Sequence, residues 1–219
     1  MMYNCNYTGR NKMKKTCILI SILFTLGFSA NLSYAQNKNA EQDRNSPFLR
    51  EFALTRSPMG HAQFCESNGA DCAQRSDKVY RMRLTPERWD QLVKVNNDIN
   101  QRIEAKTDMD AYAVEEFWTY PSNIGDCEDF ALLKRKILID EMGWHHSTLR
   151  MAVVLDENDE GHAVLMASTD QGDLILDNIR DEILSWRDVD YTYIKRQSGF
   201  DTSLWVSLRT SPIRTAKAF

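Results

Sequence analysis

The sequence lacks internal repeats, low-complexity tracts, a net positive charge and any long apolar run after residue 28. With 27 lysines and arginines against 31 acidic residues, its formal net charge is −4. This acidic balance makes nucleic acid a poor candidate for a binding partner. Because a membrane-spanning helix needs roughly 20 apolar residues, no segment after the first 35 residues is expected to cross a membrane.

The first 35 residues have the order of a secretory signal peptide. A basic stretch from Arg10 to Lys15 precedes an apolar run, and Ser33-Tyr34-Ala35 offers small residues at the cleavage positions. A membrane anchor is the alternative, but the apolar run, residues 17–28, is shorter than a span of roughly 20 residues. We therefore expect residues 1–35 to be cleaved and the mature chain to be periplasmic. Removing their four basic residues leaves 23 against 31 acidic ones, a net charge of −8.

The expected mature chain keeps three cysteines, which are Cys65, Cys72 and Cys127. An odd number of cysteines in an exported protein predicts one pair and one free thiol. Cys65 and Cys72 flank a turn-rich stretch that can bring them together in an oxidising compartment. Three reduced, buried thiols are the alternative. We predict a Cys65–Cys72 disulfide, which leaves Cys127 as the free thiol.

Two helices are predicted in the first half of the mature chain, after a flexible lead-in over residues 36–59. One helix begins at Thr85, an N-cap residue, with Pro86 at the first helical position. The other runs from about Cys127 to Met142, with Asp126 placed to cap it and Gly143 placed to end it.

From Leu149 onward the apolar pattern changes to a period of two, which predicts strands separated by turns. The expected strands are residues 149–155, 162–168, 174–176, 191–196 and 204–208. Helices therefore come first and a mostly antiparallel sheet follows. This order predicts an α+β fold for a single domain over residues 60–219, in which the helical N-terminal part packs on the sheet.

Cys127 is the strongest candidate for chemistry, because it stands in the first turn of a predicted helix. Only the thiolate is reactive, and the positive end of a helix stabilises that anion and lowers the thiol pKa. Most unpaired cysteines are simply small buried hydrophobes, which is the alternative here.

His162 and Asp177 are the candidates for a base and an orienting carboxylate. Of the four histidines, His162 opens a predicted strand, where a rigid frame can aim it. If Ser168 faces Asp173 across the next hairpin, Asp177 lies opposite Val164 and shares a face with His162. A shorter loop that moves the register by two residues keeps the same face. A structural histidine and an Asx turn at Asp177 are the alternatives.

Three acids surround the candidate nucleophile: Asp126, Glu128 and Asp129. Acids suit the first turn of a helix, so solvated caps are one interpretation. Yet three anions beside a thiolate would raise its pKa and oppose its activation. A bound Ca²⁺, which prefers hard oxygen ligands, would remove this conflict. The spacing alone favours neither interpretation.

These motifs resemble those of the bacterial transglutaminase-like cysteine peptidases, including the periplasmic LapG-type proteases. The resemblance is carried by residues 118–121, 125–131, 161–165 and 174–178. It implies a papain/transglutaminase-like fold, with Cys127 as nucleophile, His162 as general base and acid, and Asp177 as the orienting carboxylate. It also implies Ca²⁺ bound by Asp126, Glu128 and Asp129.

The resemblance further implies a protein substrate, and LapG-type relatives cut large surface adhesins under restraint by an inner-membrane receptor for cyclic di-GMP. Two other functions stay open. A transglutaminase or amidase would use the same three residues with an amine in place of water. An exported module that binds calcium or protein would carry them without using them.

Overall fold

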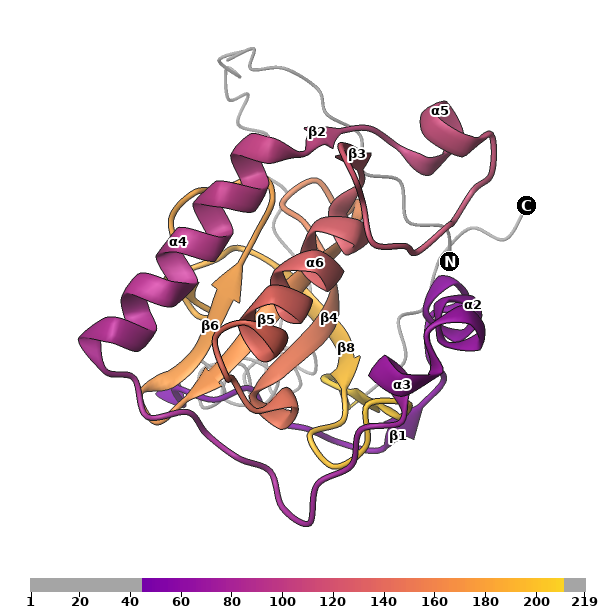
Figure 1. Cartoon of the computed structure of the whole chain (residues 1–219). Helices are drawn as coiled ribbons and strands as arrows, with labels where there is room; N and C mark the ends of the chain where they lie inside the picture. Colours follow the sequence, from indigo (N-terminus) through magenta and orange to yellow (C-terminus); the bar gives the residue numbers. More distant parts are fainter. Residues whose placement is uncertain (1–44, 211–219) are drawn as a thin grey trace, which may run out of the picture. The chain divides into compact units, whose positions relative to one another are not determined.

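The computed structural model describes residues 45–210, so the expected signal peptide and residues 36–44 lie outside the described part. Within it, seven strands form one antiparallel sheet in the order β1-β9-β8-β4-β5-β6-β7 (Figure 1). They are β1 (Leu54–Thr55), β4 (Leu149–Leu155), β5 (Gly161–Thr169), β6 (Gly172–Leu176), β7 (Leu184–Ser185), β8 (Thr192–Gln197) and β9 (Trp205–Ser207). The predicted α+β class and antiparallel sheet are therefore confirmed.

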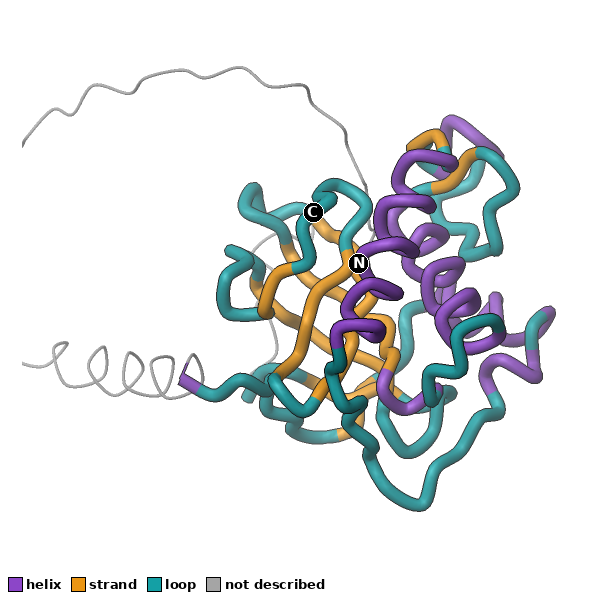
Figure 2. The backbone as a smooth tube through the Cα atoms, turned by 60° about the vertical axis from the view of Figure 1, so that its left-hand side comes forward, coloured by secondary structure: helices purple, strands orange, loops and turns teal. Residues whose placement is uncertain are grey.

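Two longer helices lie on one side of this sheet, as Figure 2 shows. They are α4 (Pro86–Arg102) and α6 (Cys127–Asp140), and α6 packs against both β4 and β5. At the start of α4 the Thr85 hydroxyl accepts a hydrogen bond from the amide of Arg88, as its N-cap position predicts. After α6, Gly143 adopts the left-handed φ of +67° that favours glycine. No helix in the described residues is long and apolar enough to cross a membrane.

The central strands are buried on both faces, and their side chains alternate between two cores. On the helix side, Met151, Val153 and Leu165 join the larger core beneath α4 and α6. On the far side, Val154 and Val164 belong to a second core that the chain after β6 covers with aromatic rings. The five strands predicted from the period of two are all present, with ends shifted by two residues at most.

Several short helices and strands were not predicted from the sequence, because they contain too few residues to show a hydrophobic period. They are α2 (Met59–Ser67), α3 (Gly69–Cys72), α5 (Asp108–Tyr112), the 3₁₀ turn η1 (His146–Thr148), and the parallel pair β2 (Glu104–Ala105) and β3 (Ile124–Gly125). A disulfide joins Cys65 at the end of α2 to Cys72 at the end of α3. The predicted pairing of these two cysteines is therefore confirmed.

The N-terminal part of the domain differs from the expected flexible lead-in. Residues 47–59 follow the sheet: β1 pairs with β9, and the carbonyl of Pro47 accepts a hydrogen bond from the amide of Asp173. Glu51 attaches this segment to the sheet, because it binds two arginines of the central strands. The sequence pattern does not show such ion pairs between distant residues. The folded domain thus begins near residue 47 and not at residue 60.

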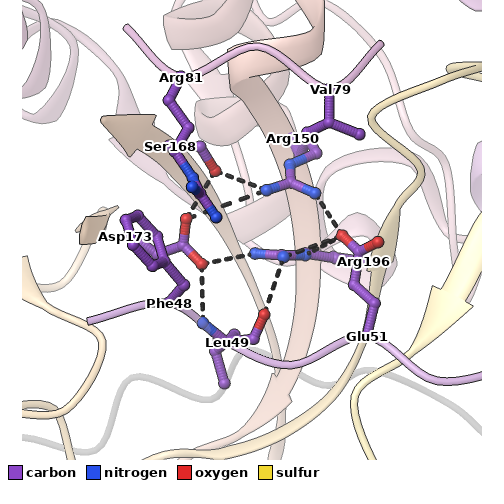
Figure 3. Close-up of a pocket in the computed structure, with 9 residues that line it drawn as sticks. All are labelled: Phe48, Leu49, Glu51, Val79, Arg81, Arg150, Ser168, Asp173 and Arg196. Carbon is purple, nitrogen blue, oxygen red and sulfur yellow. Dashed lines mark hydrogen bonds and ion pairs between the residues drawn. The ribbon is translucent and has the colours of Figure 1, made fainter. Parts of the chain in front are cut away.

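A cavity of about 260 Å³ on the far face of the sheet is lined by five charged side chains (Figure 3). Arg81 is one of them, and the other four, here called the arginine cluster, bind one another: Arg150, Arg196, Glu51 and Asp173. Arg196 donates to Asp173 at 2.8 Å and to Glu51 at 2.9 Å, and Arg150 also binds Glu51. Burial alone would raise the pKa of Asp173, but Arg196 and Arg150 outweigh it and hold the pKa below its ordinary value. The charges of this cluster therefore balance one another within the protein.

Candidate active site

Cys127 is the first residue of α6, and β3 delivers the chain to it. Gly125 is required just before this point, because a Cβ there would lie 2.9 Å from a carboxylate oxygen of Asp129. The Cys127 side chain faces the protein interior, with 1% of the residue exposed. Its position at the positive end of a 14-residue helix favours the thiolate form.

His162 and Asp177 meet as a buried pair where β5 begins and β6 ends. Nε2 of His162 lies 2.9 Å from Oδ1 of Asp177, and the residues are 5% and 1% exposed. The hairpin register that brings them together pairs Ser168 with Asp173, as one of the two predicted registers requires. Asp177 also accepts the amide of Ile179 at 3.2 Å, so it forms the Asx turn as well.

Asp177 is held by groups that sequence reasoning missed. The hydroxyl of Tyr191 donates to Oδ2 of Asp177 at 2.6 Å, and Lys134 of α6 donates to the Asp177 main-chain carbonyl at 2.9 Å. Burial would raise the pKa of Asp177, but the charge and hydrogen bond of His162, with the bond from Tyr191, lower it to about 2. A carboxylate that stays ionised in this way can orient an imidazole and stabilise its protonated form.

A second group of buried carboxylates, here called the acid cluster, surrounds the start of α6: Asp108, Asp126, Glu128 and Asp129. One carboxylate oxygen from each of Asp108, Asp126 and Glu128 lies within 4.8 Å of the others. Asp108 was not among the predicted residues. The parallel β2–β3 pair brings it beside Asp126, 18 residues later in the chain.

The structure places Asp129 outside this three-residue group. Its Oδ1 accepts a hydrogen bond from the amide of Thr119 at 2.8 Å, so one of its oxygens is engaged by the loop before β3. Asp126 differs from expectation too, because its side chain makes no N-cap hydrogen bond to α6. Instead, Oδ2 of Asp126 accepts the amide of Asp108 at 3.3 Å.

Burial without counter-charge raises the pKa of every member of the acid cluster. Desolvation is the main cause in each case: it raises the pKa of Asp126 to about 7, with a contribution from the charge of Asp108, and that of Asp129 to about 8. Burial, then the charges of Asp126 and Asp129, raise the pKa of Glu128, while burial raises that of Asp108. Oε2 of Glu128 also lies 3.2 Å from the Cys127 sulfur, so an ionised Glu128 would oppose thiolate formation.

The acid cluster fits a divalent cation with oxygen ligands. Buried oxygens of Asp108, Asp126 and Asp129 have no hydrogen-bond donor among the described residues, and none of the four acids forms an ion pair there. Carboxylates left in this state cost several kcal/mol unless a proton or a cation neutralises them. Calcium, which takes carboxylate oxygens in a flexible shell, matches the donor set.

The remaining group of metal-type side chains in the described residues is His61 with Cys65 and Cys72. Its two sulfurs are joined in the disulfide, so they are not available as thiolate ligands. Burial, then the charges of Arg135 and Lys195, lower the pKa of His61 to about 4, which keeps the ring neutral at ordinary pH. We assign this group a structural role.

The chain is similar to a known protein family and to several solved structures. A family model described as bacterial transglutaminase-like cysteine proteinase matches residues 51–212. Among solved structures, calcium-bound LapG of Legionella pneumophila is 22% identical over 80% of this chain and 90% of that chain, with a TM-score of 0.48. EGTA-treated LapG of the same organism is 28% identical over 59% and 72%, also with a TM-score of 0.48. No curated protein matches the chain.

Proposed function

The chain belongs to the bacterial transglutaminase-like cysteine proteinase family, and from that premise we propose that it is an exported peptidase that cuts a protein substrate through Cys127, His162 and Asp177. The observation that carries the proposal is the buried His162–Asp177 pair. His162 lies on β5, which packs against α6, and Asp177 directly follows β6; α6 begins with Cys127. A histidine held by an ionised carboxylate, combined with a thiol at a helix N-terminus, is what acyl transfer needs.

In the proposed reaction His162 removes the thiol proton of Cys127, and the thiolate attacks the carbonyl carbon of a peptide bond. The Cys127 amide at the start of α6 helps to stabilise the oxyanion that develops. His162 then donates its proton to the leaving amine, which departs and leaves a thioester on Cys127. Water, activated by His162, hydrolyses the thioester and restores the thiol.

In this proposal the two ring nitrogens of His162 have different tasks. Because Nε2 bonds to Asp177, proton exchange with the thiol uses Nδ1. Asp177 holds the ring in this orientation and stabilises the imidazolium that forms. Tyr191 positions Asp177 in turn, since its hydroxyl binds the other carboxylate oxygen.

The proposal includes Ca²⁺ as a resident ion, held by Asp108, Asp126 and Glu128, with Asp129 beside them. When bound, the ion supplies positive charge that offsets the carboxylates next to Cys127. Its support is the set of buried, unneutralised oxygens described above. In this arrangement the acids tie the loop that carries α5 to the junction of β3 and α6.

Location and substrate complete the proposal. We place the mature protein in the periplasm after cleavage at Ala35, and the Cys65–Cys72 disulfide supports an oxidising compartment. The substrate is a protein, and a large surface adhesin is the specific candidate, with an inner-membrane receptor for cyclic di-GMP as the regulator. The sequence resemblance to LapG-type proteases supports both of these assignments.

The test compares surface and secreted proteins from cells that make the wild-type protein, Cys127→Ala or His162→Gln. We expect a protein that is released or shortened by the wild type and retained at full length by both variants. His146→Gln is the matched control, because His146 follows the opposite end of α6. Identical patterns in all four strains contradict a peptidase.

Mass spectrometry of the new C-terminus then separates the alternatives. A free carboxylate shows hydrolysis, whereas an added amine shows transglutaminase activity through the same three residues.

A further inference from the structure

Four large apolar side chains are exposed within nine residues, on α5 and the loop that follows it. Met109 is 51% exposed, Tyr112 39%, Val114 43% and Phe117 47%. The rings of Tyr112 and Phe117 pack edge to face, with 5.1 Å between their centroids. We call these four residues the apolar platform. Single exposed apolar residues are common on soluble proteins, but several on one short segment, two of them in contact, indicate a surface that another molecule covers.

The platform is attached directly to the candidate active site. The amide of Lys106 donates to the carbonyl of Gly125 at 2.9 Å, two residues before Cys127. Asp108, the first residue of α5, donates its amide to Asp126 and accepts the amide of Phe117 on its carboxylate. Both ends of the platform are therefore fixed through one buried residue, Asp108: its main-chain amide binds Asp126, and its carboxylate binds the amide of Phe117. In Figure 1, α5 projects beyond β3 at the end of α6 where Cys127 lies.

The shape of the platform is formed before anything binds. The Thr107 hydroxyl caps α5 by accepting the amide of Asp110, and Ala113 ends the helix in the left-handed conformation with a φ of +58°. Burial, together with the charges of Asp129, Asp108 and Asp126, raises the pKa of Tyr112, which indicates that its ring lies near the acid cluster. A surface that is already ordered loses little conformational entropy when a ligand covers it.

We propose that the apolar platform holds the substrate polypeptide beside the bond to be cut, and that it selects extended segments with apolar side chains. The inference rests on the proposed function, because it takes Cys127 as the point where the scissile carbonyl must lie. An extended chain advances about 3.3 Å per residue, so a segment bound at Cys127 continues past neighbouring loops within a few residues. The loop next to the residue before Cys127 is the one that carries the platform.

The experiment selects peptides from a phage-displayed library of random sequences of about 12 residues, long enough to span some 40 Å when extended. The bait is the full chain with Cys127→Ala, which binds without cutting. The same selection is run on Cys127→Ala combined with Phe117→Ala. The matched control combines Cys127→Ala with Phe200→Ala, since Phe200 is 51% exposed and lies in the β8–β9 loop at the opposite end of the domain (Figure 1).

We expect the bait to enrich peptides with adjacent apolar or aromatic residues, and Phe117→Ala to weaken their binding about tenfold, as loss of a central aromatic contact does. Phe200→Ala should change their affinity less than about twofold. Equal affinity in the Phe117→Ala and Phe200→Ala proteins overturns the proposal, and so does a bait that enriches no apolar sequence. Purified synthetic copies of the selected peptides are then incubated with the wild-type protein. Peptides that bind through Phe117 but are never cut would contradict the proposed peptidase activity, while the proposal of a binding surface would still hold.

Discussion

The arginine cluster and the acid cluster are both built from buried charges, yet they solve the problem of burial in opposite ways. In the arginine cluster two guanidinium groups face two carboxylates, and the pKa of Asp173 stays below its ordinary value. In the acid cluster four carboxylates face one another, and burial raises the pKa of Asp126 to about 7 and that of Asp129 to about 8. The first cluster is neutral by its own composition, whereas the second depends on protons or a cation from solution.

This difference is the one expected if the arginine cluster is structural and the acid cluster belongs to the proposed active site. The arginine cluster fastens residues 47–51 to the far face of the sheet, through Glu51 and the main chain of Leu49. The acid cluster lies against Cys127 and holds the loop of the apolar platform. Strongly shifted pKa values cluster at functional sites, and the two clusters differ in charge balance, so they should respond differently to mutation, cation and pH.

The largest effect on stability is expected at the arginine cluster. Arg196→Met removes the nearer counter-charge of Asp173 and one of the two arginines that bind Glu51, which should lower the free energy of unfolding by about 3–5 kcal/mol. Urea unfolding in Ca²⁺ and in EGTA measures this loss, which should be the same in both. Lys136→Met, which removes an exposed ion pair with Asp140, is the control and should cost less than about 1 kcal/mol. A loss as small as the control's would show that the arginine cluster contributes little.

Neutralising one carboxylate should have opposite signs in the two clusters. In EGTA at pH 8, Asp126→Asn removes like-charge repulsion and should raise the free energy of unfolding by about 1–2 kcal/mol. Asp173→Asn, the matched change in the arginine cluster, should lower it. Added Ca²⁺ should raise the melting temperature of the wild type and hardly change that of Asp126→Asn, as thermal unfolding can measure. A destabilised Asp126→Asn protein in EGTA would contradict the description of the acid cluster as unneutralised.

The stabilisation by Ca²⁺ should grow as the pH rises from about 5.5 to 8.5. The raised pKa values of Asp126 and Asp129 mean that the metal-free folded protein holds protons that the unfolded chain has released. The free energy of unfolding of the metal-free protein therefore falls as pH rises from near 4 through 7 to 8. Bound Ca²⁺ replaces those protons and should therefore prevent this fall in the free energy of unfolding.

His61 acts in the other direction, because its pKa is lowered to about 4 and its contribution to stability rises with pH up to about 6.5. The measurement is therefore the difference in melting temperature between Ca²⁺ and EGTA at each pH, in which the contribution of His61 cancels. A difference that is constant across this range would contradict cation binding by the raised carboxylates.

The smallest effect on stability is expected at the His162–Asp177 pair, where Asp177 is held by hydrogen bonds from several groups. Tyr191→Phe removes the hydroxyl that fixes Asp177 and should lower kcat about tenfold with little change in KM, at a stability cost of about 1 kcal/mol. Steady-state kinetics on a cleaved peptide measure both constants. Tyr193→Phe is the control, because its buried hydroxyl donates to the carbonyl of Trp186 and not to Asp177. Equal kcat values in the two variants would remove the positioning role of Tyr191.

The sequence predicts those site residues that lie in or next to regular helices and strands. The period of two locates the strands, and the Ser168–Asp173 register places Asp177 on the face of His162 before any coordinates are known. Asp126 and Glu128 are visible because they flank Cys127. These predictions succeed because each depends on spacing within one helix or one hairpin.

The rest depends on contacts between distant segments, which a single sequence does not reveal. Asp108 reaches the acid cluster only through the parallel β2–β3 pair, and the one local signal was Thr107, an N-cap residue followed by acids. Glu51 lies 99 residues from Arg150 and 145 from Arg196, in a segment whose composition indicates a flexible lead-in. Tyr191 carries no motif, because its role comes from the path of the chain after β7.

The reactivity of Cys127 tests the central claim most directly. Metal-loaded wild type, His162→Gln and the control His146→Gln are treated with iodoacetamide near neutral pH, and mass spectrometry measures the rate of modification at Cys127. The account predicts rapid modification in the wild type and in His146→Gln, and a rate roughly 100-fold lower in His162→Gln, because the thiolate then loses its base. Slow modification at Cys127 in all three proteins, insensitive to His162, would contradict it.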